Sequence, residues 1–282
     1  MDPLKIDSLL PAEMASQAES LGIAKANMPH LKTLILAVLA GAFIAFGAVF
    51  FTTVTTASTM SYGITRLIGG ICFSLGLVLV IVGGAELFTG NNLIIMAWAN
   101  KKVNTIQILI NWGLVYLGNF IGAMFIVFLM MMSKQYLSAS GQVGIQTLNI
   151  AKAKCEMGFL QAFSLGILCN ILVCLAVWLC YSSKTITGKI LSIVFPITAF
   201  VTCGFEHSIA NMYFIPKAIL LLQQKNPEIL ILIKQSNFNY DSITWSNFII
   251  NNLLPVTLGN IVGGAVLVGL VYWFVYLRNN KK

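Results

Sequence analysis

Charged side chains are scarce in this sequence. Asp, Glu, Lys and Arg make up only 9% of the 282 residues, while 58% are hydrophobic and the mean hydropathy is +0.86. A soluble domain carries about 25% charged residues. Because there are too few polar groups to cover a surface facing water, lipid must be the solvent for much of the chain.

The sequence also lacks a continuous basic stripe and closely spaced pairs of cysteines. The formal charge is +8, but the Lys and Arg residues are scattered singly or in pairs between apolar runs. No basic stripe exists for a nucleic acid to follow, so the positive charge does not indicate nucleic-acid binding.

The six cysteines form no CxxC pair and have no cluster of His beside them. Packing thiols are therefore favoured over a metal site or disulfides, and no cofactor is expected.

What the sequence does contain is six long apolar runs. A helix that crosses a membrane needs about 20 apolar residues. The runs cover residues 33–56, 67–96, 106–132, 159–181, 190–215 and 249–277. This pattern predicts an all-α polytopic membrane protein that forms one domain over 1–282, with a six-span membrane domain at 33–277.

The first 32 residues contain apolar side chains at helical spacing, namely Leu10, Met14, Ala18, Leu21 and Met28. This spacing predicts an amphipathic helix within 1–32. The helix is expected to lie on the membrane surface or on a neighbouring subunit, and an ordinary surface helix is an equal alternative.

Positive charge indicates the orientation. Six spans put both termini on one side, together with the segments 97–105 and 182–189. These segments carry Lys5, Lys25, Lys32, Lys101, Lys102, Lys184, Lys189, Arg278, Lys281 and Lys282. The opposite side carries Arg66, Lys134, Lys152, Lys154, Lys217, Lys225 and Lys234, spread over longer loops. The positive-inside rule therefore places both termini, including the tail 278–282, in the cytoplasm.

Two short motifs occur twice, in the same order. Gly-x-Glu-x4-Asn stands at 84–91 and 204–211, in the second and fifth runs, and LGNxxG stands at 117–122 and 258–263, in the third and sixth. Runs one to three thus repeat as runs four to six. Because three is odd, the second copy crosses the membrane in the opposite direction. The pattern predicts an inverted repeat whose broken second and fifth spans meet near the midplane. Chance matching of Gly-rich apolar sequence is the alternative.

Ionisable side chains inside a span are costly and usually functional. Glu86 and Glu206 occupy equivalent positions beside the two expected helix breaks, followed by Asn91 and Asn211. A carboxylate there can bond freed backbone N–H groups. A structural role is therefore favoured for both glutamates over direct contact with a substrate.

His207 has no counterpart in the first repeat, where Leu87 stands. A neutral His can donate a hydrogen bond to an anion and can exchange a proton near neutral pH. Its position at a break, next to a Glu, favours a functional role over that of a satisfied core histidine.

Neutral donors near the breaks suit a small anion, because they replace part of its hydration without trapping it. The candidates are Thr89, Asn119, Asn170, Asn211 and Asn260. Lys154 lies just before the fourth run. At a pore mouth it would raise the local concentration of anions, although an ordinary loop lysine is the alternative.

Several segments resemble signatures of the formate/nitrite transporter family: GGAELFTGNNL at 83–93, CGFEHSIANM at 203–212 and LGNIVGG at 258–264. Two more, LLPAEMASQAESLGIAKA and GGICFSLGLVLV, are similar to bacterial formate channels in particular. The resemblance covers nearly the whole chain. It implies an aquaporin-like fold of six spans, a homopentamer with one pore in each protomer, and a place in the bacterial cytoplasmic (inner) membrane.

The resemblance also implies roles for individual residues. Leu87 and Phe200 are expected to form a cytoplasmic constriction, and Phe73, Phe88 and Val173 a periplasmic one. A polar chamber around Thr89 and His207 is expected between them, and the pathway also includes the following polar residues: Asn170, Asn260 and Lys154.

The expected function is permeation of formate, with protonation in the chamber and a flux that depends on pH. A nitrite or hydrosulfide channel on the same scaffold is the nearest alternative, since the ELFTG form of the first motif is also common among nitrite channels. An intramembrane enzyme built on Glu206 and His207 is disfavoured because neither a nucleophile motif nor a set of metal ligands accompanies them. A purely structural subunit would leave the polar residues of the broken spans without a role.

Overall fold

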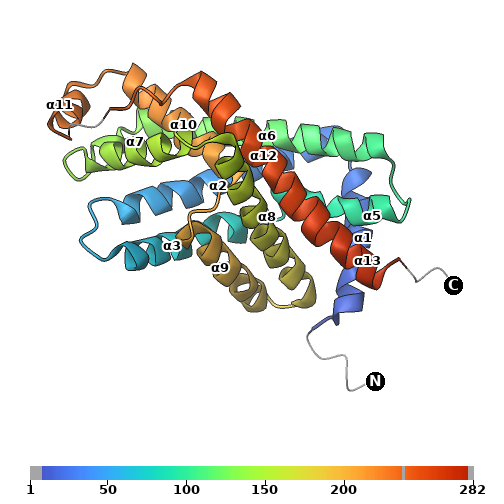
Figure 1. Cartoon of the computed structure of the whole chain (residues 1–282). Coiled ribbons are helices and arrows are strands. Elements are labelled where there is room, and N and C mark those ends of the chain that lie inside the picture. Colours follow the sequence, from blue (N-terminus) through green and yellow to red (C-terminus); the bar gives the residue numbers. More distant parts are fainter. Residues whose placement is uncertain (1–7, 237–238, 279–282) are drawn as a thin grey trace.

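The computed structural model describes residues 8–236 and 239–278, which form helices and one isolated bridge between Ser8 and Ser183 (Figure 1). Three lysines of the predicted charge pattern, Lys5, Lys281 and Lys282, lie outside the described residues. The elements are α1 Pro11–Ala26, α2 His30–Thr55, α3 Tyr62–Gly83, α4 Phe88–Asn91, η1 Asn92–Ile94, α5 Ile95–Ala99, α6 Thr105–Met132, η2 Gln135–Leu137, α7 Gln142–Cys155, α8 Phe159–Ser182, α9 Ile186–Thr202, α10 Ser208–Gln223, α11 Pro227–Ser236, η3 Asn247–Leu253, α12 Leu254–Ile261, η4 Val262–Leu270 and α13 Val271–Tyr276.

Five helices within the described residues are long and apolar enough to cross a membrane: α2, α3, α6, α8 and the continuous helix Asn247–Tyr276. The fifth predicted run instead contains the shorter apolar helix α9, a break and then α10. Many large apolar side chains on these helices are exposed, including Phe125, Phe128 and Phe195. Such faces need lipid or another protein surface to cover them.

The second and fifth predicted runs are both interrupted at a glycine. Gly84 and Gly204 adopt left-handed backbone conformations, with φ of +77° and +74°. The next residue bonds back into the helix in each case, Ala85 N–H to Val80 O and Phe205 N–H to Phe200 O, both at 2.9 Å. This is the Schellman pattern that ends a helix and satisfies its last carbonyls. The chain resumes as a new helix at α4 and at α10.

Glycines allow the uninterrupted helices to approach closely. A Cβ at Gly118 or Gly122 of α6 would clash with α2, and one at Gly259 or Gly263 would clash with α8. For three of these glycines the clash would be with backbone carbonyl oxygens, which cannot rotate away. Both LGNxxG motifs therefore act as small-residue contacts between helices.

Different helices lie at the two ends of the molecule. Helix α1 packs against α13, α5 and the end of α8, so both described chain ends lie together, whereas α7 and α11 lie at the opposite end (Figure 1). The N-terminal helix predicted within 1–32 is present and packs on its own protomer. Its buried side is formed by Met14, Ala15, Ala18 and Gly22, whereas Leu10 is 69% exposed.

We expect Gly122→Ala to lower the melting temperature of the detergent-solubilised protein. A methyl group would meet the carbonyl oxygen of Val38, and overpacking of this kind costs about 1–3 kcal/mol. Gly113→Ala in the same helix is the control, since a Cβ there meets nothing within 4 Å. Thermal unfolding followed by size-exclusion chromatography checks both variants. An unchanged melting temperature for Gly122→Ala would contradict the close contact between α2 and α6.

Candidate functional site

Glu86 lies in the first break and is buried in a network of polar side chains. Its Oε1 accepts a hydrogen bond from Lys25 Nζ at 2.7 Å, and its Oε2 accepts one from Asn91 Nδ2 at 2.7 Å. Lys25, at the end of α1, also donates to Asn91 Oδ1 at 2.9 Å. Asn111 completes the network by accepting from Asn91 at 3.0 Å and donating to the carbonyl of Lys25 at 3.2 Å.

Glu206 in the second break has the same set of partners. Lys154 Nζ donates to its Oε1 at 2.6 Å, and Asn211 Nδ2 donates to its Oε2 at 2.7 Å. Asn252 accepts from Asn211 at 2.7 Å and donates to the carbonyl of Lys154 at 3.1 Å. Because a buried carboxylate is stable only when paired and hydrogen-bonded, these partners keep Glu206 in place.

Asn119 of α6 fixes the chain on either side of the first break. Its Nδ2 donates to the carbonyls of Ala37 and Glu86 at 2.7 and 2.9 Å, and its Oδ1 accepts from the N–H of Phe88 at 3.0 Å. Phe88 begins α4, so its N–H is one that the helix itself leaves unbonded. One amide side chain therefore satisfies two backbone groups that the break exposes and also bonds to α2.

Asn260 of α12 does the same at the second break. Its Nδ2 donates to the carbonyls of Gly166 and Glu206 at 2.8 and 3.0 Å, and its Oδ1 accepts from the N–H of Ser208 at 3.0 Å. Asn170 likewise donates to internal acceptors, including the carbonyl of Asn260 at 2.7 Å. The amide donors of both predicted pathway asparagines are thus engaged within the chain.

His207 and Thr89 face each other between the two breaks. Oγ1 of Thr89 lies 2.9 Å from Nε2 of His207, and both residues are buried, at 0% and 3% exposure. Nδ1 of His207 accepts a hydrogen bond from the N–H of Ala210 at 3.1 Å. Nδ1 therefore carries no proton, and the neutral ring holds its proton on Nε2, where it donates to Thr89.

This arrangement has two chemical consequences. No described group accepts the hydroxyl hydrogen of Thr89, so the hydroxyl can donate to a small ligand. A doubly protonated His207 would set an Nδ1–H against the N–H of Ala210, and the helix cap therefore favours the neutral imidazole.

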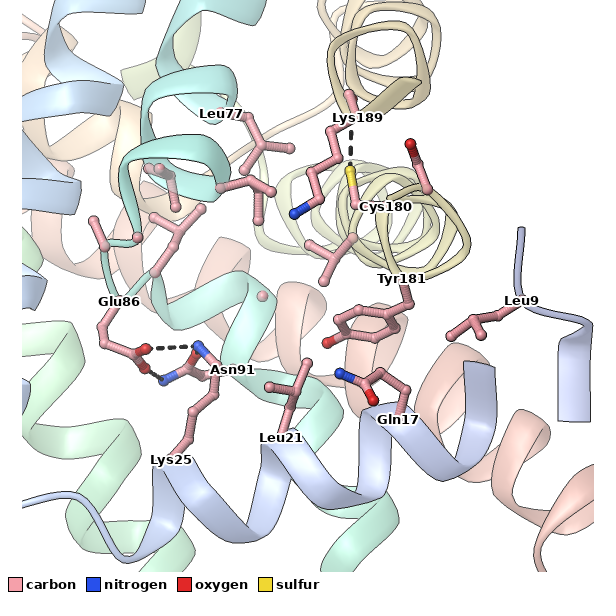
Figure 2. Close-up of a pocket in the computed structure, with 18 of the residues that line it drawn as sticks. Leu9, Gln17, Leu21, Lys25, Leu77, Glu86, Asn91, Cys180, Tyr181 and Lys189 are labelled. Atoms are coloured by element: carbon pink, nitrogen blue, oxygen red, sulfur yellow. Dashed lines mark hydrogen bonds and ion pairs between the residues drawn. The ribbon is translucent and has the colours of Figure 1, made fainter. Parts of the chain in front are cut away.

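A cavity of about 540 Å³, here called the α1-side cavity, opens at the end where α1 lies (Figure 2). Leu87 and Gly90 line it, and so do Lys25 and Glu86, which form an ion pair. Figure 2 shows the ammonium group of Lys189 pointing into the same space from the opposite wall.

A second cavity of about 210 Å³, here called the α7-side cavity, is lined by residues that include Lys154, Arg66, His207 and Phe200. His207 lines the α7-side cavity, whereas Leu87 and Gly90, which flank its partner Thr89 in the sequence, line the α1-side cavity; Thr89 itself is buried and lines neither. The two spaces therefore approach one polar pair from opposite ends of the molecule.

The apolar residues group differently from the expectation. Phe200 packs edge-on against Phe73, with ring centroids 5.8 Å apart, and stacks on His207 at 6.0 Å. Both phenylalanines line the α7-side cavity, whereas Leu87 and Leu77 line the α1-side cavity. Phe200 thus faces the α7-side cavity and Leu87 the α1-side cavity, and a constriction formed by the two together stays a prediction.

Phe88 also lies elsewhere than expected. Its ring packs against Trp112 and Tyr116 of α6, with centroids 6.1 and 4.9 Å away, and it lines neither cavity. Val173 of α8 is buried at 1% exposure. The structure thus groups Phe73 with Phe200 rather than with Phe88.

Three residues of the polar networks are absent from the candidates drawn from the sequence: Lys25, Asn111 and Asn252. A signal for the asparagines exists, since Asn111 stands eight positions before Asn119 and Asn252 stands eight before Asn260. Lys25 and Lys154 share a different feature, because each lies in the last turn of the short helix before an apolar run.

The family model described as "Formate/nitrite transporter" matches residues 12–274. The chain is 47% identical over 275 residues to "Formate channel FocA" of Escherichia coli (strain K12), covering 97% of this chain and 96% of that protein. It is 43% identical to "Formate channel FocA" of Haemophilus influenzae, over 93% of each chain. A solved structure described as "Pentameric formate channel with formate bound" is 44% identical, with a TM-score of 0.82 over 88% of this chain and 98% of that one.

We expect Lys154→Met to destabilise the protein strongly, because it leaves the carboxylate of Glu206 buried without its cation. Breaking a buried pair in this way costs about 3–5 kcal/mol. The double variant Lys154→Met/Glu206→Gln removes both charges and should recover much of the loss. Melting temperatures of Lys154→Met, Glu206→Gln and the double variant test this coupling. If the losses in melting temperature of the two single variants simply added up in the double variant, the two residues would not be coupled. The ion pair would then not hold the break.

Proposed function

The chain belongs to the formate/nitrite transporter family, and from this premise we propose that it carries formate through the membrane between the α1-side and α7-side cavities. It is a membrane-embedded protein of apolar helices. The observation that carries the proposal is the buried pair of Thr89 and His207, which stands where the two cavities approach each other. Relatives that share nearly the whole chain are named formate channels.

We propose that the pathway has one apolar constriction on each side of this pair. Leu87 and Leu77 form the constriction on the α1 side, and Phe73 and Phe200 form the one on the α7 side. Water and hydrated ions meet apolar surface at both places, which excludes them. A small anion that loses its hydration finds the Thr89 hydroxyl as a donor inside.

The chamber suits weak binding. Thr89 can donate its hydroxyl hydrogen, and His207 can turn its Nε2–H from Thr89 toward a ligand. Both donors are neutral, so they stabilise an anion without holding it as a fixed charge would. Asn170 and Asn260 support the chamber from outside, because their amide hydrogens bond to backbone carbonyls and other internal oxygens.

Protonation of the ligand aids its passage. A bare carboxylate is costly in an apolar constriction, whereas formic acid is neutral. A flux that rises as pH falls is therefore expected. His207 can supply a proton only if Nδ1 first gains one and gives up its bond to Ala210. If the proton comes from water together with the anion, His207 keeps its hydrogen bond to Ala210.

The scaffold we propose is a six-span inverted repeat of the aquaporin-like type, with broken second and fifth spans. The equivalence of the hydrogen bonds around Glu86 and Glu206 supports it. So does the equivalence of Asn119 and Asn260, which bond the same backbone positions of the two breaks. Two halves that run in opposite directions would present their breaks to one site.

We further propose a homopentamer in the bacterial cytoplasmic membrane, with both termini in the cytoplasm. The similar solved structure is described as pentameric. The exposed apolar faces of the protomer suit contacts with lipid and with neighbouring subunits. Lys101, Lys102, Lys184 and Arg278 belong to the segments expected on the side of the termini, in accord with the positive-inside rule.

The alternatives have less support. The printed names of the close relatives favour formate over nitrite or hydrosulfide. An enzyme built on Glu206 and His207 is disfavoured because the named relatives are channels and transporters, and because Glu206 is fully used in its ion pair. A purely structural subunit gives no role to Thr89 and His207.

We expect proteoliposomes that contain the protein to take up [14C]formate faster than empty liposomes, with saturation and only weak inhibition by nitrite, hydrosulfide or lactate. Uptake should rise as the pH is lowered, because more of the anion crosses as the acid. Strong conduction of nitrite or hydrosulfide without formate uptake would keep the family but replace the substrate.

We expect His207→Asn to retain formate uptake within about tenfold, because Asn caps the N-terminus of α10 as His207 does and offers a neutral donor. His207→Phe should lose most uptake, because it removes both the cap and the donor. The dependence of uptake on pH is measured for His207→Asn. A dependence equal to that of the natural protein would show that the proton does not come from His207, whereas its loss would identify His207 as the proton donor.

A further inference from the structure

One lysine in each cavity is paired with the glutamate of a break. Lys25 lies 2.7 Å from Glu86, and Lys154 lies 2.6 Å from Glu206. At a point several ångströms away, the electrostatic potentials of two opposite charges this close together nearly cancel. Lys154, expected from the sequence to attract the anion, is therefore poorly placed to do so. Any attraction must come from a charge without such a partner.

At the α7-side cavity, Arg66 is a positive charge that is not paired with a carboxylate of the described residues. Its guanidinium lies over the ring of Phe51, 5.4 Å from the centroid, and one nitrogen donates to the carbonyl of Val201. A carbonyl fixes the group but leaves its charge uncompensated. No carboxylate of the described residues pairs with Arg66, and its buried Nε has no hydrogen-bond partner there. An Arg keeps its charge at any working pH and presents several donors to a carboxylate.

Lys189 is the equivalent charge at the α1-side cavity. Its ammonium group points into the cavity (Figure 2), and among the described residues no carboxylate pairs with it. Lys184 lines the same cavity and is also free of a carboxylate within the described chain. The one acidic residue of that wall, Glu86, is already balanced by Lys25. The cavity therefore has an excess of positive charge.

The two unpaired cations occupy similar places in the fold. Arg66 lies near the start of α3, which begins at Tyr62, and Lys189 lies near the start of α9, which begins at Ile186. Each of these helices runs from a mouth to a break. Unpaired positive charge thus lies at both ends: Arg66 lies beside the second break, with one guanidinium nitrogen 3.5 Å from the position a Cβ on Gly204 would take, and Lys189 lines the α1-side cavity.

We propose that Arg66 and Lys189, assisted by Lys184, supply the positive charge that gathers formate at the two mouths, whereas Lys25 and Lys154 act as supports of the breaks. This inference rests on the proposed function and names the residues that serve it. A cleft lined by one sign of charge with apolar walls concentrates the opposite ion. Both residues are positioning residues, because they attract the anion before it reaches Thr89 and His207.

The test is the dependence of [14C]formate uptake on salt in proteoliposomes. Reconstituted protein faces both ways, so the double variant Arg66→Gln/Lys189→Gln removes the charge from whichever mouth faces the anion. At low salt it should raise the half-saturating formate concentration by roughly threefold to tenfold, with little change in the maximum rate. In about 1 M salt, where the screening length is about 3 Å, the difference from the natural protein should disappear.

Three control variants separate attraction of the anion from structural effects and from the effect of surface charge. Arg66→Lys/Lys189→Arg keeps both charges and should retain the low-salt behaviour. Lys102→Gln/Lys134→Gln removes two exposed charges that line neither cavity and should leave the half-saturating concentration unchanged. A third variant, Lys154→Met/Glu206→Gln, removes no net charge and should leave the salt dependence unchanged whatever its maximum rate.

Two results would overturn the proposal. One is a half-saturating concentration in Arg66→Gln/Lys189→Gln that equals that of the natural protein at low salt. The other is a fall in maximum rate that is the same at low and high salt, because it would indicate a structural role only. If the natural protein carried no formate at all, the proposed function would fail instead, and the same variants would be judged on the uptake of nitrite.

Discussion

The fold depends on two buried carboxylates at places where a membrane helix stops. A helix that breaks inside lipid leaves backbone groups without partners, and each unsatisfied group costs several kcal/mol there. Asn119 and Asn260 bond backbone groups that the two breaks expose. The carboxylates of Glu86 and Glu206 each accept hydrogen bonds from a lysine and an asparagine, which holds the breaks in place. The lysines come from α1 and α7, which cover opposite ends of the molecule. These two short helices are therefore structural parts of the breaks as well as covers of the two mouths.

The functional pair arises where the two halves differ. His207 corresponds to Leu87 of the first half, and Thr89 corresponds to Ile209 of the second. Each half thus contributes one polar and one apolar side chain next to its break, and the two polar ones meet at 2.9 Å. The equivalent parts of the halves support the backbone, and the differing parts form a chamber with neutral donors.

Sequence patterns predicted the scaffold better than the chamber. The apolar runs, both breaks and the structural role of Glu86 follow from the cost of polar groups in lipid, which acts on sequence directly. The partners Lys25, Asn111 and Asn252 were not predicted, because contacts between distant helices depend on how the helices pack. The same reason explains why the edge-on packing of Phe200 against Phe73 was not predicted. Asn260 was predicted as a neutral donor, but its hydrogens are bonded to Gly166 and Glu206.

The central claim is that formate passes between Thr89 and His207. A crystal structure of the protein grown in a high concentration of formate tests it most directly. The account predicts formate within hydrogen-bond distance of Thr89 Oγ1, with His207 Nε2 as the second donor and with Asn260 still bonded to the backbone. Formate bound away from this pair, with the contact between Thr89 and His207 unchanged, would contradict the account.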